Sequence, residues 1–169
     1  DYGEDLSCKV KNHTIIDGLG CDYGKCHFCI HPKIHPKFRL RDPQLIVDEV
    51  EHMIRKGIGY FTFTASDTPL PHAIRISEEI LKRKLHIEFT LLTRGSRGAH
   101  TRKDYLVDSF RKIIRAGMRI LYMGAECGND DMLKDVINKN LTAGDIADTI
   151  DCIRRASDLE RQKVYIITS

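Results

Sequence analysis

Apolar residues recur along this chain in two alternating patterns: short β-branched or aromatic runs, and longer stretches with helical spacing. The short runs have the composition of buried strands and cover residues 14–16, 58–64, 86–92, 118–123 and 164–168. Between them, apolar residues three or four positions apart predict helices over 42–57, 70–84, 101–117, 131–137 and from 142 onward. Strand and helix alternate at intervals of roughly 30 residues, which predicts right-handed crossovers and a parallel sheet.

Polar residues at the helix starts support these boundaries. Asp42 followed by Pro43 is typical of a cap and a first helical turn. The spacing of a capping box occurs twice, at Thr101 with Asp104 and at Thr142 with Asp145. The prolines within residues 30–37 instead exclude a regular helix, so we expect an extended, partly basic loop there.

The number of strand-helix units limits the fold. A complete barrel of eight units takes about 250 residues, whereas this chain has 169 residues and five predicted strands. We therefore predict an α/β fold: a partial (β/α) TIM-like barrel with parallel strands, truncated after the fifth strand. Because the last predicted strand has no covering helix after it, we expect a segment of a longer polypeptide, with residues 1–169 in one domain.

Composition changes this picture little. The 41% hydrophobic and 30% charged content is ordinary for a globular protein, and no apolar run approaches the roughly 20 residues of a membrane span. The formal net charge of +3 neither implies nor excludes a nucleic-acid partner. Six cysteines, three of them scattered, do not resemble the framework of a secreted domain. We expect a cytoplasmic protein with no membrane partner and no visible leader.

The most informative stretch is Gly20-Cys21-Asp22-Tyr23-Gly24-Lys25-Cys26-His27-Phe28-Cys29, directly after the first predicted strand. Three thiols this close cannot all pair with one another, and the two-residue gap between Cys26 and Cys29 suits two thiolates on one metal centre. A structural zinc ion would need a fourth ligand, because no second cysteine pair follows. The nearby candidates are His27, His31 and His35. An iron–sulfur cubane on three cysteines would instead leave one iron open to a small molecule.

This stretch resembles the cluster-binding loop of the radical S-adenosylmethionine (radical SAM) enzymes. In that family three closely spaced cysteines, with an aromatic residue just before the last, follow the first strand of a barrel; Phe28 holds the aromatic position here. Four residues separate Cys21 from Cys26, where the commonest family spacing is three. Tyr-Gly-Lys-Cys-His-Phe-Cys is similar to a variant seen in members with a cobalamin-type domain, including some peptide-modifying maturases. The cluster-binding loop would span residues 18–38 of a radical SAM core domain.

The resemblance implies that Cys21, Cys26 and Cys29 bind a [4Fe-4S] cluster, whose open iron is chelated by the amino and carboxylate groups of S-adenosylmethionine. It implies an enzyme that cleaves this cofactor reductively to a 5′-deoxyadenosyl radical, which abstracts hydrogen from a substrate. An electron donor such as flavodoxin or ferredoxin is implied, and cobalamin only where a domain outside this chain supplies it. A peptide or a small molecule is the expected substrate, with RNA left open. The alternative function is a non-catalytic zinc-binding module.

Four further residues are candidates for cofactor binding. Glu126 matches the family position whose carboxylate accepts hydrogen bonds from the cofactor ribose, and Arg94 would pair with the methionine carboxylate. Asp67 would receive the cofactor's ammonium group or make a turn, and Phe28 would pack beside the adenine or beneath the cluster loop. Glu126 and Arg94 also have plain alternatives, a structural glutamate and an exposed loop arginine. Except for Phe28, these residues follow predicted strands, and parallel barrels carry their chemistry at the carboxyl ends of strands.

Overall fold

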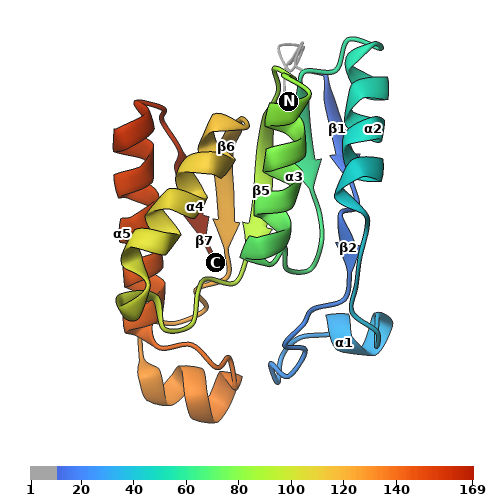
Figure 1. Cartoon of the computed structure of the whole chain (residues 1–169). Helices are drawn as coiled ribbons and strands as arrows, with labels where there is room; N and C mark the ends of the chain where they lie inside the picture. Colours follow the sequence, from blue (N-terminus) through green and yellow to red (C-terminus); the bar gives the residue numbers. More distant parts are fainter. Residues whose placement is uncertain (1–10) are drawn as a thin grey trace, which may run out of the picture.

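A five-stranded parallel sheet forms the centre of the computed structural model, which describes residues 11–169 (Figure 1). The strand order is β1-β4-β5-β6-β7, and each neighbouring pair is parallel. All five strands predicted from the sequence are present, as β1 (Asn12–Ile15), β4 (Tyr60–Phe63), β5 (Glu88–Thr93), β6 (Met118–Met123) and β7 (Tyr165–Thr168). Because the strands are parallel, their carboxyl ends lie at one edge of the sheet.

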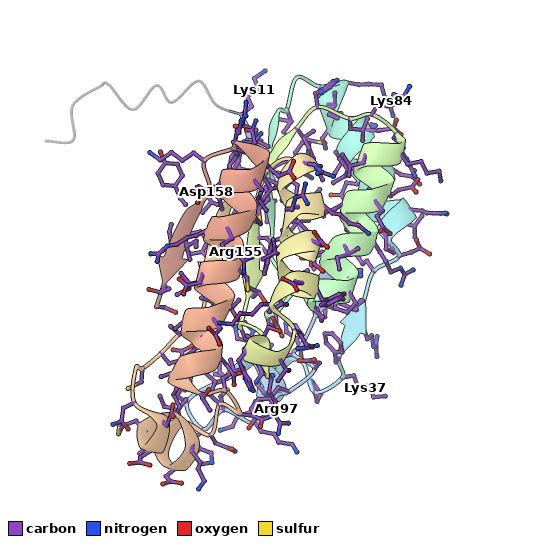
Figure 2. The ribbon with its side chains drawn as sticks, turned by 60° about the vertical axis from the view of Figure 1, so that its left-hand side comes forward. Lys11, Lys37, Lys84, Arg97, Arg155 and Asp158 are labelled. Carbon is purple, nitrogen blue, oxygen red and sulfur yellow. The ribbon has the colours of Figure 1, made fainter. Side chains whose placement is uncertain are left out.

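Four long helices cover one face of this sheet. They are α2 (Pro43–Ile54), α3 (Leu70–Lys82), α4 (Lys103–Arg115) and α5 (Ala143–Glu160). Figure 1 shows them side by side in front of the strands. Figure 2 labels both ends of the molecule, with Lys37 and Arg97 near the strands' carboxyl ends and Lys11 and Lys84 at the opposite end. A parallel sheet with one helical layer is the predicted partial (β/α) barrel.

The core lies between the sheet and these helices. In β4 the side chains alternate, so that Phe61 and Phe63 are buried while Tyr60 and Thr62 lie partly exposed on the other face. Phe63 packs edge-to-face against Phe89 of β5, with ring centroids 5.1 Å apart. Within the described residues, no helix is both long enough and apolar enough to cross a membrane.

Two of the predicted helix caps form. The Asp42 side chain accepts a hydrogen bond of 2.8 Å from the backbone N–H of Gln44 at the start of α2. At α5 the capping box is complete: Thr142 Oγ1 accepts from Asp145 N at 3.0 Å, and Asp145 Oδ2 accepts from Thr142 N at 3.1 Å. The other oxygen of Asp145 accepts from the backbone of Gly98 and Ala99. Asp145 therefore joins α5 to the loop between β5 and α4.

Two local predictions are wrong. Thr101 does not cap α4; it ends a 3-10 turn, η1 (Ala99–Thr101), and its hydroxyl donates to Gly98 O at 2.9 Å. Residues 30–37 are not wholly extended, because His31–Ile34 form the one-turn helix α1. Pro32 lies in the first turn of α1, where its missing N–H leaves no hydrogen bond unmade. The short helix predicted over 131–137 is present as the π-helical turn η2 (Met132–Ile137).

The cysteine stretch is closed at its base by a ladder that the sequence pattern does not predict. Two short strands, β2 (Gly18–Leu19) and β3 (Arg39–Leu40), pair antiparallel with Gly18 opposite Leu40. We call residues 16–41 the cysteine loop. Its two ends are held together, and the three cysteines lie between them.

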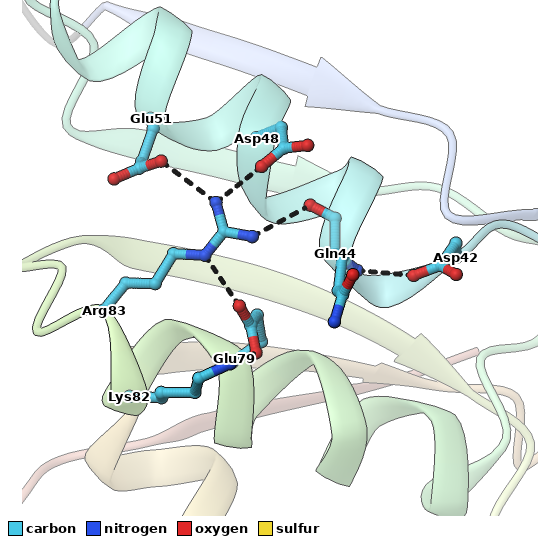
Figure 3. Close-up of polar contacts among 7 residues, drawn as sticks. All are labelled: Asp42, Gln44, Asp48, Glu51, Glu79, Lys82 and Arg83. Carbon is cyan, nitrogen blue, oxygen red and sulfur yellow. Dashed lines mark hydrogen bonds and ion pairs between the residues drawn. The ribbon is translucent and has the colours of Figure 1, made fainter.

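A cluster of charged residues joins α3 to α2 (Figure 3). The Arg83 guanidinium lies 2.6 Å from Asp48, 2.7 Å from Glu79 and 3.0 Å from Glu51. Hydrogen bonds to Asp48 and then Glu79 raise the pKa of Arg83 above its ordinary value. The planar, forked guanidinium can contact several carboxylates at once, which suits it to join two neighbouring helices.

Candidate active site

The seven residues predicted to bind the cluster or S-adenosylmethionine line one cavity of about 410 Å³ at the carboxyl ends of the strands; of the candidate histidines, His31 lines it and His27 and His35 do not. The cysteine loop supplies one side of it, and the segments after β4, β5 and β6 supply the other. The predicted residues in its lining are Cys21, Cys26, Phe28, Cys29, Asp67, Arg94 and Glu126. The structure thus brings them together, as parallel strands require, while the role of each in binding a cofactor stays a prediction.

The three cysteines are free thiols of intermediate exposure. Burial raises the pKa of the Cys21 and Cys26 thiols above their ordinary values. At Cys26, the positive charges of Lys139 and Arg94 oppose this rise, while the neighbouring Cys29 and Cys21 add to it. Ionising Cys21 and Cys26 is therefore unfavourable without a nearby cation. A metal centre supplies that charge, because metal-bound thiols are deprotonated.

The arrangement of the thiols does not favour the zinc alternative. With Zn–S bonds of about 2.3 Å, a tetrahedral zinc ion holds its sulfur ligands within roughly 4 Å of one another. In the described part of the chain, the one group of potential ligand atoms that all lie within 4.8 Å of each other is Cys21, Asp22 and Asp67, which does not include the other two cysteines. A cubane instead spreads its thiolates over different irons.

The nearby histidines make other contacts. His27 Nδ1–H donates to Val136 O at 2.9 Å, and His31 Nδ1 is hydrogen-bonded to Ser66 Oγ at 2.8 Å. Each of these two histidines thus has one ring nitrogen engaged in a hydrogen bond, although His31 and Ser66 line the same cavity as the cysteines. These contacts give both histidines a structural explanation.

Arg94 is packed into the site. Its Nη2 donates to Lys139 O at 2.6 Å, and its guanidinium carbon lies 4.2 Å from the centre of the Tyr23 ring. Asp22 Oδ1 lies 3.8 Å from its Nη1. The side chain is only 19% exposed, so the alternative of an exposed loop arginine is wrong. Binding a methionine carboxylate would use the N–H groups that these contacts leave.

Asp67 is buried beside the cysteines, with 4% of its surface exposed. Its Oδ1 accepts a hydrogen bond from the Arg94 backbone at 3.1 Å. Burial, followed by the neighbouring charge of Asp22, raises the pKa of Asp67 to about 6. The carboxylate thus lies where a cationic partner would stabilise its charged form. It also ties the loops after β4 and β5 together, across 27 residues of sequence and not within a local turn, and its binding of an ammonium group stays a prediction.

Glu126 has an unusual backbone conformation, with φ of 64° in the left-handed region. Its N–H donates to Ser169 O, and its Oε1 accepts from Lys139 Nζ at 3.2 Å. A Cβ on Gly124 would lie 2.7 Å from Oε1, so any larger residue there would require the end of the Glu126 side chain to shift. One carboxylate oxygen has no partner in the described structure, which leaves it able to accept a hydroxyl.

Phe28 is 61% exposed at the cavity. The alternative that it packs beneath the cluster loop is therefore wrong. An exposed aromatic ring next to three thiols presents a flat apolar surface to whatever occupies the cavity.

Sequence reasoning missed two residues that hold the site together. Asp17 is fully buried, and its carboxylate accepts from Ala65 N at 2.8 Å and from Thr68 Oγ1 at 2.7 Å. Lys139 is 4% exposed and forms the contact with Glu126. Asp17 gives no local signal, because its partners are about fifty residues away. Lys139 lies in Asn138-Lys139-Asn140-Leu141-Thr142, a stretch that resembles the radical SAM family, but the sequence does not show which of these residues reaches the site.

The radical SAM superfamily model matches residues 15–168 of this chain. That match covers most of the sequence and includes all the residues that line the site except Ser169. The chain therefore belongs to the radical SAM superfamily, as the cysteine spacing and Phe28 predict.

Two curated relatives carry the same printed name, anaerobic magnesium-protoporphyrin IX monomethyl ester cyclase. The protein from Rubrivivax gelatinosus is 32% identical over 127 residues, which are 73% of this chain and 21% of that protein. The protein from Cereibacter sphaeroides is 28% identical over 153 residues, which are 88% of this chain and 24% of that protein. This chain thus spans about a quarter or less of the length of these relatives.

Solved structures agree with the fold. The cobalamin-dependent S-adenosylmethionine radical enzyme OxsB is 22% identical, with a TM-score of 0.71 over 92% of this chain and 23% of that one. The radical S-adenosylmethionine methyltransferase TsrM from Kitasatospora setae, with cobalamin and a [4Fe-4S] cluster bound, is 20% identical, with a TM-score of 0.73 over 95% of this chain and 29% of that one. At these identities the likeness concerns the fold alone, and it confirms the predicted architecture.

Proposed function

We propose that this chain is the catalytic core of a radical SAM enzyme, in which Cys21, Cys26 and Cys29 hold a [4Fe-4S] cluster that binds S-adenosylmethionine. The observation that carries the proposal is that the three thiols and the Glu126 carboxylate line the same cavity of about 410 Å³. When bound, the cluster supplies one electron that cleaves a carbon–sulfur bond of the sulfonium, giving methionine and a 5′-deoxyadenosyl radical for hydrogen abstraction from substrate.

The residues present fit such a group. Three thiolates suit a cubane with one open iron, and together they give the site a net negative charge that grows on reduction. The guanidinium of Arg94 and the ammonium of Lys139 line the same cavity and offset that charge. Both cations are largely withdrawn from solvent, with 19% and 5% of their side chains exposed, so their charges are little screened.

The other side chains would bind and orient the nucleoside. Glu126 would accept hydrogen bonds from the ribose hydroxyls through the oxygen that Lys139 does not contact. Asp67 would accept the ammonium group, and Arg94 would donate to the carboxylate. Phe28, exposed at the cavity, would stack beside the adenine.

The substrate and partners of the whole protein are part of this proposal. We infer a peptide or small-molecule substrate and an electron donor of the flavodoxin or ferredoxin type. The solved neighbours named above bind cobalamin, and we place any cobalamin in a domain outside these residues. Three free thiols at the site suit a reducing cytoplasm.

Anaerobic reconstitution with iron and sulfide tests the proposal. We expect about four irons and four sulfides per chain, with absorbance near 400 nm as for biological cubanes. The Cys26→Ser variant should lose this cluster, and Cys152→Ser, at a buried core position, should keep it. With a strong reductant, the loaded protein should convert S-adenosylmethionine to 5′-deoxyadenosine. Tight zinc binding without iron uptake would contradict the proposal.

A further inference from the structure

One short segment of the chain, residues 136–139 at the carboxyl end of η2, makes repeated hydrogen bonds to the cysteine loop. We call it the holding segment. The His27 backbone N–H donates to Ile137 O at 3.0 Å, and the His27 ring donates to Val136 O at 2.9 Å. His27 directly follows Cys26, so these bonds fix the chain on one side of that thiol.

Asn138 fixes the chain on the other side of Cys26. Its Nδ2 donates to Lys25 O at 3.0 Å, and Lys25 directly precedes Cys26. The Tyr23 hydroxyl lies 2.7 Å from Asn138 O and 3.0 Å from Asn138 Oδ1, so it can donate to either. Asn138 adopts φ of 55°, a left-handed conformation that asparagine tolerates better than most residues.

The next residue connects the same segment to the far side of the cavity. Lys139 Nζ donates to Glu126 Oε1 at 3.2 Å, and Lys139 O accepts from Arg94 Nη2 at 2.6 Å. Its backbone N–H donates to Leu133 O at 2.8 Å. Two consecutive residues therefore contact both the loop that carries the thiols and the carboxylate that faces them.

Hydrogen bonds matter here because burial does not position the cysteine loop. Between residues 16 and 41 no aliphatic or aromatic side chain is buried; the buried residues are Asp17, Gly18 and Gly20. A loop without a core is held by its directional polar contacts. Those around Cys26 come mostly from the holding segment.

We propose that Asn138 is a positioning residue, which sets the place of Cys26 relative to Glu126 and so the distance between the cluster and the nucleoside. The inference rests on the proposed function and adds to it a residue that lies outside both the cysteine motif and the predicted cofactor contacts. Asn138 acts through the backbone of the loop and does not itself line the cavity.

The chain offers a matched pair of variants. Asn138→Gly removes the side-chain bonds to Tyr23 and Lys25 and keeps the left-handed backbone, which glycine adopts freely. Asn140→Gly is the same substitution two residues away at φ of 57°, on an exposed residue whose side chain makes no hydrogen bond within residues 11–169. The two variants therefore differ in the hydrogen bonds that they remove and not in backbone conformation.

The test is the rate at which the reconstituted protein loses iron to an excess of a colourless iron chelator. Asn138→Gly removes the hydrogen bond to Lys25 O, worth about 1 kcal/mol, while the Tyr23 hydroxyl keeps the backbone oxygen of residue 138 as an acceptor. We therefore expect release roughly fivefold faster for Asn138→Gly, with Asn140→Gly at the unmodified rate. The change that S-adenosylmethionine causes in the electron paramagnetic resonance spectrum of the reduced cluster should also weaken in Asn138→Gly. Both apoproteins should keep their thermal unfolding midpoints within a few degrees.

Tyr23→Phe examines the same contact from the loop side. It removes the hydroxyl that reaches Asn138 and keeps the ring beneath Arg94. If the two residues act through one contact, the double variant should release iron more slowly than the product of the two single effects predicts.

Equal iron release from Asn138→Gly and Asn140→Gly, with an unchanged spectrum, would overturn the positioning role and leave the proposed function standing. Failure of the unmodified protein to take up iron would overturn the proposed function, and the positioning role with it.

Discussion

The helical layer and the cysteine loop are stabilised in different ways. In the layer, apolar side chains from four helices and the sheet are buried in one core. In the cysteine loop most of the large apolar side chains are exposed, including Phe28 at 61%, Ile30 at 60% and Ile34 at 57%. Burying apolar surface stabilises the fold by roughly 25 cal/mol per Å² without requiring a particular contact geometry. A hydrogen bond, in contrast, also requires a particular direction between donor and acceptor. The layer therefore sets stability, and the polar contacts of the loop set geometry.

This comparison predicts that the same substitution, phenylalanine to alanine, lowers the free energy of unfolding much more in the helical layer than in the cysteine loop. Phe89→Ala removes a core ring that is 1% exposed and packed edge-to-face against Phe63, so it should lower the free energy of unfolding by about 3–5 kcal/mol. Phe28→Ala should change it by less than about 0.5 kcal/mol. Urea unfolding of both apoproteins measures the difference. Equal losses would show that the loop contributes to the core after all.

A smaller loss of unfolding free energy is expected from substituting Asp145, whose carboxylate joins α5 to the loop between β5 and α4. Burial raises the pKa of Asp145, but hydrogen bonds from Thr142, Gly98 and Ala99 outweigh it, so the pKa is lowered below its ordinary 3.8. Asp145→Asn should therefore cost about 1–2 kcal/mol at neutral pH.

The cost of Asp145→Asn should depend on pH in a defined direction. A carboxyl with a lowered folded-state pKa stabilises the fold above its unfolded pKa and loses that contribution as pH falls through the folded value. Unfolding free energies of the two proteins should thus converge below about pH 4, measured by urea titration at several pH values. A difference that stays constant down to about pH 2 would mean that the charge is not the cause.

The charge cluster around Arg83 in Figure 3 should contribute less to the free energy of unfolding than Asp145 does. Arg83→Lys keeps the charge but loses the forked geometry that reaches Asp48, Glu51 and Glu79 together. The expected loss is at most about 1 kcal/mol and should shrink further in high salt. Thermal unfolding at low and high ionic strength measures it. A larger loss that is insensitive to salt would point to packing of the arginine stem instead.

The smallest change in stability is expected at the site itself. Cys26→Ser should leave the unfolding free energy of the apoprotein within about 0.5 kcal/mol, because the thiol lies in a loop without a core. Cys152→Ser places a hydroxyl in the buried layer and should destabilise more. A large loss of unfolding free energy in Cys26→Ser would show that the cysteine loop stabilises the fold as well as forming the site.

The parts of the fold that repeat along the sequence could be predicted. Each strand and each long helix has its own run of apolar residues, and Asp42 and Thr142 cap as their local sequence predicts. The convergence of Asp67, Arg94 and Glu126 follows from parallel strands. These features depend on neighbours in the chain or on the regularity of the barrel.

The missed features depend on partners distant in sequence or on very short elements. The β2–β3 ladder pairs Gly18 with Leu40, and two-residue strands leave no periodicity to detect. The helix α1 is a single turn, and proline at its start hides it. Asn138 and Lys139 matter only because the fold brings them to Lys25 and Glu126. No local rule predicts such contacts.

The long helices all cover one face of the sheet. On the opposite face, which they do not cover, the side chains differ between β4–β5 and β6–β7. Near β4 and β5 it presents the hydroxyls of Tyr60 and Thr90, which hydrogen-bond each other at 2.6 Å. Toward β6 and β7 it presents Tyr122 and Ile167, at 44% and 41% exposure. Any group packed against this face at β6 and β7 would cover two large side chains that are now 44% and 41% exposed, whereas at β4 and β5 it would meet hydroxyls that already bond each other.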